Sequence, residues 1–163
     1  MPNAFTDEEA KRIRQELILA GIRLSKELGM QKMSVEKLTA AVGIAKGSFY
    51  LFFGSKEDFI LETAAYASEK TQKMLLAKLN GRAQMSAHEF MEFYNEFLHS
   101  DLDLMNGLTV SDFYWLKDHI KKQVLFDPDM QIKTAQFWLS LINDVREGVD
   151  TGTFVNLIKS IYA

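Results

Sequence analysis

Apolar residues recur at spacings of three and four along most of this chain, which is typical of amphipathic α-helices that pack against a common core. The first such stripe lies within residues 7–28. Thr6 and Glu9 have the spacing of a capping box at its start, and Gly29 follows it where a helix commonly ends. We therefore predict a first helix over residues 7–28.

Two short helices and one long helix are predicted next. Ser34 precedes about two turns of helical pattern, which end before Gly43. Residues 45–51 form another short helical segment, and a Gly-Ser pair then precedes a long helix over residues 56–79. Two short helices joined by a glycine-containing turn are the elements of a helix-turn-helix, although the packed helices of a bundle can share this pattern.

The remainder of the chain is also helical by its pattern. Ser86 and Glu89 repeat the capping-box spacing ahead of a fifth helix. Further helices are predicted over about residues 110–125, 129–147 and 152–163. Only two prolines interrupt the 163 residues, so long helices can run unbroken. The predicted fold class is therefore all-α.

The composition is that of a folded globular protein and excludes several kinds of site. Hydrophobic residues make up 47% and charged residues 25%, far from the composition of a disordered chain. The absence of cysteine excludes disulfides and thiolate metal sites. No apolar run is long enough to span a bilayer, and residues 1–6 lack the pattern of a secretory signal, so we expect a cytoplasmic protein without a membrane partner.

Charge is distributed unevenly along the chain, whose formal net charge is -3. Residues 1–60 hold nine basic and eight acidic side chains, whereas residues 61–163 hold ten and fourteen. Residues 1–60 therefore tolerate nearby phosphates better than the more acidic residues 61–163 do. The net negative charge argues against a protein that coats nucleic acid without regard to sequence.

The segment over residues 42–50 leaves a small polar face exposed once its apolar side chains point inward. The outer positions are Lys46, Gly47, Ser48 and Tyr50. Lys46 can reach phosphate or guanine acceptors, Ser48 can bond a base edge or a phosphate, and Tyr50 can donate to a phosphate. Gly47 permits close approach of the backbone. Such a face can enter the major groove of DNA.

The segment over residues 34–59 combines several motifs in a fixed order and spacing. Gly47-Ser48-Phe49-Tyr50 is followed by an aromatic pair and then by Ser55-Lys56-Glu57, which caps the next helix. This combination resembles the TetR family of bacterial repressors. The resemblance implies an N-terminal three-helix helix-turn-helix domain over residues 1–55. It also implies a helical ligand-sensing and dimerisation domain over residues 56–163.

The resemblance also implies which residues contact DNA. Lys56 has a physical reason to do so, because a helix N-terminus already favours a phosphate. Phe52 departs from the family, which often has a tyrosine or histidine there that can bond phosphate. The candidate DNA-binding residues are Ser34, Lys46, Gly47, Ser48, Tyr50 and Lys56.

A homodimer on a palindromic DNA operator is the expected functional form, since two recognition helices related by two-fold symmetry read two half-sites. The resemblance implies a repressor that a small-molecule effector releases from the operator, and the aromatic side chains described next suit a lipophilic or aromatic effector. We expect the surface that includes Phe137, Leu141 and Val145 to take part in the dimer interface.

Aromatic and methionine side chains are concentrated between residues 90 and 138. Most of them are expected to fill a helical core, because they recur at helical spacing. A minority can line a pocket for a flat or lipophilic small molecule. The candidate effector-binding residues are Phe93, Tyr94, Phe97, Phe113, Trp115 and Trp138.

Two other classes of protein fit the sequence less well. The three histidines are scattered, and the chain has no His-Glu-x-x-His motif and no phosphate-binding glycine loop. We therefore expect no enzyme activity, no catalytic residues, no metal and no cofactor. A helical adaptor without specific DNA binding stays an alternative, in which the polar face over residues 46–50 has no DNA to contact.

Overall fold

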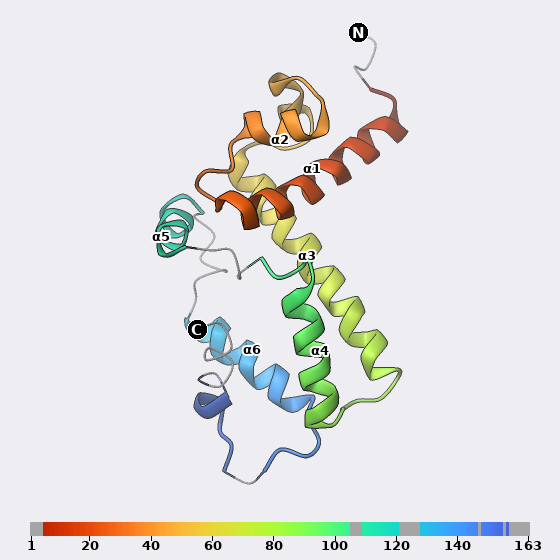
Figure 1. Cartoon of the computed structure of the whole chain (residues 1–163), viewed down its shortest axis with the longest axis vertical. Coiled ribbons are helices and arrows are strands. Elements are labelled where there is room, and N and C mark those ends of the chain that lie inside the picture. Colours follow the sequence, from red (N-terminus) through yellow and green to blue (C-terminus); the bar gives the residue numbers. More distant parts are fainter. Residues whose placement is uncertain (1–4, 105–108, 121–127, 147, 155, 157–163) are drawn as a thin grey trace. The chain divides into compact units, whose positions relative to one another are not determined.

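The computed structural model describes residues 5–104, 109–120, 128–146, 148–154 and 156. Its helices are, in chain order, α1 (Asp7–Leu28), α2 (Val35–Val42), the 3₁₀ helix η1 (Lys46–Leu51), α3 (Lys56–Leu79), α4 (Ala87–His99), α5 (Val110–His119) and α6 (Pro128–Ser140) (Figure 1). Within these residues the one extended pairing is a parallel bridge between Met85 and Ile142. The predicted all-α fold is confirmed.

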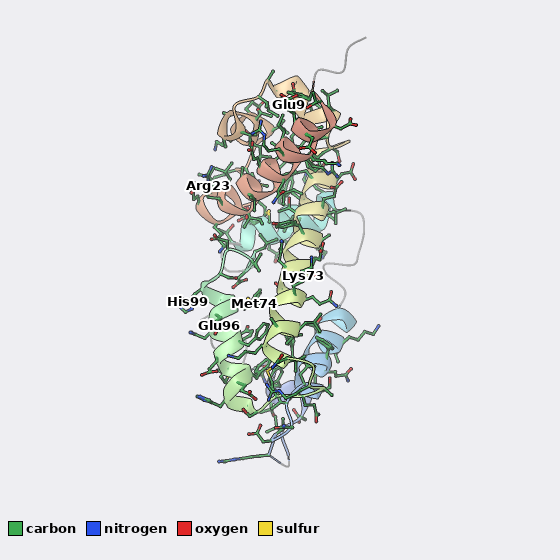
Figure 2. The ribbon with its side chains drawn as sticks, turned by 90° about the vertical axis from the view of Figure 1, so that its right-hand side faces the viewer. Glu9, Arg23, Lys73, Met74, Glu96 and His99 are labelled. Carbon is green, nitrogen blue, oxygen red and sulfur yellow. The ribbon has the colours of Figure 1, made fainter. Side chains whose placement is uncertain are left out.

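Local caps fix the ends of the first helices where the sequence predicts them. The Thr6 hydroxyl accepts from the backbone N–H of Glu9, whose carboxylate accepts from the backbone N–H of Thr6 at 2.9 Å. Those bonds lower the pKa of Glu9. Figure 2 shows Glu9 and Arg23 on the first and last parts of α1. At the other end, Gly29 adopts a positive φ of 81°, which favours glycine and ends the helix.

The helix predicted over residues 129–147 is wrong at its C-terminal end, because α6 stops at Ser140. The backbone N–H of Met85 donates to the carbonyl of Leu141 at 2.8 Å, and that of Asn143 donates to the carbonyl of Met85 at 3.0 Å. These bonds to the connection between α3 and α4 replace the next turn of helix. For α5, the predicted C-terminal part over residues 121–125 lies outside the described residues. The same holds for most of the last predicted helix, of which residues 152–154 and 156 are described and are helical.

The chain divides into two compact units, each made of two segments. Unit 1 comprises Met1–Lys70 and Asp101–Ile120, and unit 2 comprises Thr71–Ser100 and Lys121–Ala163. The helix α3 contributes to both units, and α5 belongs to unit 1. This packing does not test the functional boundary between residues 55 and 56, which stays a prediction.

An aromatic triad of Phe49, Phe53 and Phe59 forms the centre of unit 1. The ring centroid of Phe59 lies 5.6 Å from that of Phe49 and 4.9 Å from that of Phe53, and all three side chains are buried. The ring of Phe59 also presses on α1 at Gly21, where a Cβ atom would come within 2.5 Å of its Cζ. The triad therefore links η1, α3 and α1.

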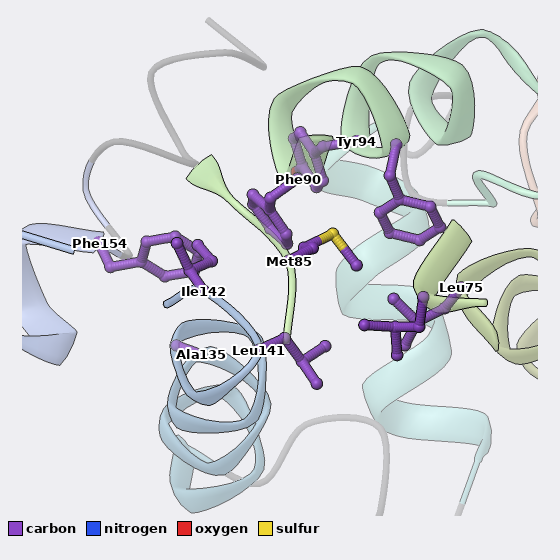
Figure 3. Close-up of a cluster of buried hydrophobic side chains, with 10 residues drawn as sticks. Leu75, Met85, Phe90, Tyr94, Ala135, Leu141, Ile142 and Phe154 are labelled. Atoms are coloured by element: carbon purple, nitrogen blue, oxygen red, sulfur yellow. The ribbon is translucent and has the colours of Figure 1, made fainter. Parts of the chain in front are cut away.

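The core of unit 2 surrounds Met85, which is fully buried (Figure 3). The ring of Phe90 lies 5.9 Å from each of the rings of Tyr94, Trp138 and Phe154. Leu141 belongs to this core, so the prediction that it lies in a dimer interface is wrong. Burying the apolar side chain of Leu141 among aromatic rings lowers the free energy of the folded chain relative to leaving it exposed.

None of the helices in the described part of the chain combines the length and the apolar character that a membrane-spanning segment requires.

Replacing Gly21 by alanine tests the close approach of α1 to Phe59. In an open helix this change stabilises by about 1 kcal/mol. Here the added methyl group meets the buried ring, and overpacking of that kind costs about 1–3 kcal/mol. We expect Gly21→Ala to lower the free energy of unfolding, measured by urea denaturation.

Gly47→Ala is the matched control for that measurement, because a Cβ atom at Gly47 meets nothing within 4 Å. Its urea midpoint should not fall. A Gly21→Ala protein at least as stable as the wild type would contradict the packing of Phe59 on α1.

Candidate DNA-binding surface

Arg14 of α1 fixes the C-terminal end of η1. Its guanidinium lies 4.5 Å from the ring centroid of Phe53, donates to the backbone carbonyl of Phe52 and pairs with the carboxylate of Glu62 in α3. The cation therefore satisfies a carbonyl at the end of a short helix while covering an aromatic face. Arg14 was not among the predicted site residues, since its partners are far away along the chain.

The predicted recognition helix is the 3₁₀ helix η1, in which three residues make one turn. The backbone N–H of Ser48 donates to the carbonyl of Ala45 at 2.9 Å, and that of Phe52 donates to the carbonyl of Phe49 at 3.0 Å. Because Phe49 points into the aromatic triad, the side chains on the other rows of η1 are left outside. One of these rows holds Gly47 and Tyr50, and the next holds Ser48 and Leu51.

The outer rows of η1 are accessible. Tyr50 is 55% exposed and Leu51 66% exposed, while Ser48 is half-buried. Gly47 has open space where a side chain would be. Leu51 was not among the predicted site residues, because an apolar residue in a helix-turn-helix is expected to be buried. Its exposure beside Tyr50 makes it a candidate for apolar contact with a thymine methyl group.

Lys46 begins η1 and forms an ion pair with Glu36 of α2. Both side chains are 57% exposed, so the pair lies at the surface. The hydrogen bond from Lys46 is the main reason why the pKa of Glu36 falls to about 2. The carboxylate therefore stays ionised at neutral pH. It neutralises the charge of Lys46, which the sequence predicts to contact DNA. Glu36 itself was not among the predicted site residues.

Ser34 caps the N-terminus of α2, as its sequence position predicts. Its hydroxyl accepts from the backbone N–H of Lys37 at 3.3 Å, and the side chain is half-buried. The hydroxyl therefore already satisfies one of the free N–H groups of α2. It can still donate its own hydrogen, as a contact to a phosphate oxygen requires.

Lys56 begins α3, but its ammonium turns toward other parts of unit 1. It donates to the backbone carbonyl of Met30 at 2.9 Å and to that of Gln31 at 3.3 Å, and lies 4.3 Å from the ring centroid of Trp115. Burial lowers the pKa of Lys56, an effect that the carboxylates of Glu57 and Asp112 oppose. The phosphate contact stays a prediction, and it requires the ammonium to leave these partners first.

The candidate effector residues are divided between the two units. Phe93 and Tyr94 are buried in the core of unit 2, against which Phe97 and Trp138 are partly buried. Trp115 belongs to unit 1. The side chain of Phe113 lies outside the described part of the chain.

An open hollow of about 260 Å³ lies between α1 and α2. None of the candidate effector residues borders it. Its lining residues are Glu16, Leu19, Ala20, Arg23, Ala41 and Val42. Among the residues that the structure describes, no three His, Asp or Glu side chains lie close enough to share a metal ion.

Comparison with known proteins identifies the N-terminal part of the chain. Residues 17–63 match the family model described as bacterial regulatory proteins, tetR family. This range includes α2, η1 and all three residues of the aromatic triad. No curated protein matches the chain.

Two solved structures share the fold over nearly the whole chain. A gamma-butyrolactone receptor, described as an ArpA-like protein, has a TM-score of 0.64 at 18% identity, over 94% of this chain and 78% of that one. The TetR family protein CprB from S. coelicolor A3(2) has a TM-score of 0.65 at 16% identity, over 93% and 75%. At such identities the likeness shows the fold alone.

The family match covers the helix-turn-helix, and the fold of the whole chain is that of a TetR family protein. Proteins of this family are DNA-binding regulators and not enzymes. Residues 17–63 therefore form a helix-turn-helix of the tetR family of bacterial regulatory proteins.

Proposed function

We propose that this chain is a ligand-responsive repressor that binds a palindromic operator as a homodimer and leaves it when a small lipophilic or aromatic effector binds. The exposed polar face of η1, held on the aromatic triad, is the observation that carries the proposal. A rigid support with small and polar side chains on its outer face is what entry into a major groove requires.

The proposed DNA contacts divide into positioning and base-reading groups. The hydroxyl of Ser34 and the phenol of Tyr50 bind phosphates, which fix the position of the domain on the duplex. Ser48 and the backbone at Gly47 approach the base edges, and Lys46 reaches a phosphate or a guanine after leaving Glu36. Lys56 is left out of this set, because its ammonium is already bound within unit 1.

Two copies of the chain are proposed to bind together, since the short η1 reads few base pairs by itself. A two-fold dimer places two such readers about 34–36 Å apart on successive major grooves. Phe137 and Val145 stay candidates for the interface, because both are exposed on unit 2.

The proposed effector site is the aromatic part of unit 2. Phe93, Tyr94, Phe97 and Trp138 lie in or against one cluster, and the partial exposure of Trp138 gives a ligand access to that cluster. Apolar side chains with a few polar atoms suit a lipophilic small molecule. One of the two similar structures is a receptor for a gamma-butyrolactone, a small molecule of that kind.

Selection of binding sites from random DNA duplexes tests the DNA-binding function. We expect the full chain to enrich a palindrome with two half-sites about one helical turn apart. Tyr50→Phe should then weaken binding about fivefold through one lost hydrogen bond. Lys46→Ala should reduce the slope of log affinity against log salt by about one unit, and Ser48→Ala should change the selected bases.

Lys70→Ala serves as the charge-matched control in the same assay, since Lys70 lies over Tyr66 on α3, away from η1. Failure to enrich any sequence would exclude the repressor and favour the helical adaptor.

Glu36→Gln tests whether the carboxylate competes with DNA for Lys46. Removing the negative charge frees Lys46, so affinity for duplex of any sequence should rise several-fold and its salt dependence should steepen. The control is Glu27→Gln, which removes an equally exposed carboxylate from an ion pair with Arg23 on α1. Equal effects of the two substitutions would show that only net charge matters.

Trp138 provides a spectroscopic test of the effector site. In a Trp115→Phe background it is the one tryptophan of the chain. A lipophilic compound that releases DNA should change its emission and raise the melting temperature, because the ligand binds the folded state. A releasing compound that leaves Trp138 emission unchanged would place the effector site elsewhere.

A further inference from the structure

The turn between α1 and α2 is held from two sides by residues far away in the sequence. Gln31 lies in this turn, and the turn leads directly to Ser34, the N-cap of α2. Lys56 of α3 binds the carbonyls of Met30 and Gln31. Asp112 of α5 binds the backbone N–H of Gln31 at 2.8 Å.

Asp112 is well suited to this contact. It is buried, and its carboxylate accepts from the backbone N–H of Thr109 at 2.9 Å and from the Thr109 hydroxyl at 2.6 Å. Burial raises the pKa of Asp112, but the hydrogen bonds from Gln31 and Thr109 outweigh burial and keep it low. The first turn of α5 is therefore capped by the same carboxylate that binds the turn before α2.

Gly29 makes room for this carboxylate. A Cβ atom at Gly29 would come within 2.6 Å of a carboxylate oxygen of Asp112, and the positive φ of 81° already disfavours any other residue. Ser111 adds a hydrogen bond to the side-chain oxygen of Gln31 at 3.0 Å. The first turn of α5 therefore packs against the turn between α1 and α2, where Gly29 leaves space for Asp112.

Trp115 completes the contact one turn further along α5. Its ring covers the ammonium of Lys56 at 4.3 Å, and the ring of His119 stacks on it with a centroid distance of 4.4 Å. An ammonium group has three N–H donors, of which carbonyl oxygens take two. A DNA phosphate would have to compete with both carbonyls and with the ring face.

We propose that Lys56, Trp115 and Asp112 position the turn before α2, and that Lys56 serves this docking contact and is not a phosphate ligand. The inference rests on the proposed DNA-binding function. Its consequence is that α5, which the chain joins at both ends to unit 2, controls how well ordered the N-terminus of α2 is before DNA binds. When the contact is lost, the turn becomes ordered only on binding DNA, and the free energy of that ordering weakens the affinity.

The salt dependence of binding to the selected duplex separates the two roles of Lys56. We expect Lys56→Ala and Trp115→Leu each to weaken binding about fivefold, with the slope of log affinity against log salt unchanged. The double variant should be no weaker than either single one, because both remove the same contact. Lys46→Ala provides the reference for a lost DNA contact, and Lys70→Ala the reference for a surface lysine over a ring.

A second measurement needs no DNA and therefore stays informative if the repressor proposal fails. In a Trp138→Phe background, Lys56→Ala should shift the emission of Trp115 and speed hydrogen exchange over residues 30–37, whereas Lys70→Ala should do neither. Asp112→Asn, which keeps the side-chain size, should speed exchange in the same segment.

Two results would overturn the inference. The first is a salt slope reduced by about one unit in Lys56→Ala together with unchanged affinity in Trp115→Leu, which would make Lys56 a phosphate ligand. The second is unchanged emission and unchanged hydrogen exchange in Lys56→Ala, which would mean that the docking contact does not hold the turn.

Discussion

The contact of Phe59 with Gly21 is the constraint on which the DNA-binding surface depends. A 3₁₀ helix of six residues cannot hold its own shape, because helix formation is cooperative and short helices are marginal in water. Its orientation therefore comes from Phe49 and Phe53, which rest on Phe59. Phe59 in turn is fixed because α1 offers a glycine where the ring packs against it. Each exposed side chain of η1 takes its direction from this buried packing.

Two cations in unit 1, Arg14 and Lys56, make contacts of the same kind. Arg14 and Lys56 each cover an aromatic ring, and each donates to backbone carbonyls at a place where regular hydrogen bonding stops. A long basic side chain is suited to this task, since its aliphatic part packs while its charged end binds oxygen. Basic residues of a DNA-binding domain therefore need not face DNA. Lys46, with its exposed partner Glu36, is the contrasting case.

The sequence predicts features that depend on residues close together in the chain, and it misses those that depend on distant residues. Both ends of α1 and α2 and the start of α4 depend on caps within a few residues, and they lie where the sequence places them. The end of α6 depends on Met85, more than fifty residues away, and was missed. The position of Lys56 depends on Trp115 in the same way, because neither residue alone indicates the other. The exposure of Leu51 follows from the 3₁₀ geometry, which periodicity over six residues cannot distinguish from α.

The shortness of η1 limits how much information one copy of the chain can extract from DNA. Six residues at a rise of about 2.0 Å span about 12 Å, which is the length of roughly three to four base pairs. A word of that length recurs by chance every few hundred base pairs or less, whereas a genome offers about a million or more competing sites. Most of the discrimination must then come from the spacing between half-sites and from how easily the intervening duplex bends or twists. Base pairs that no side chain contacts would therefore contribute to the sequence specificity of this protein.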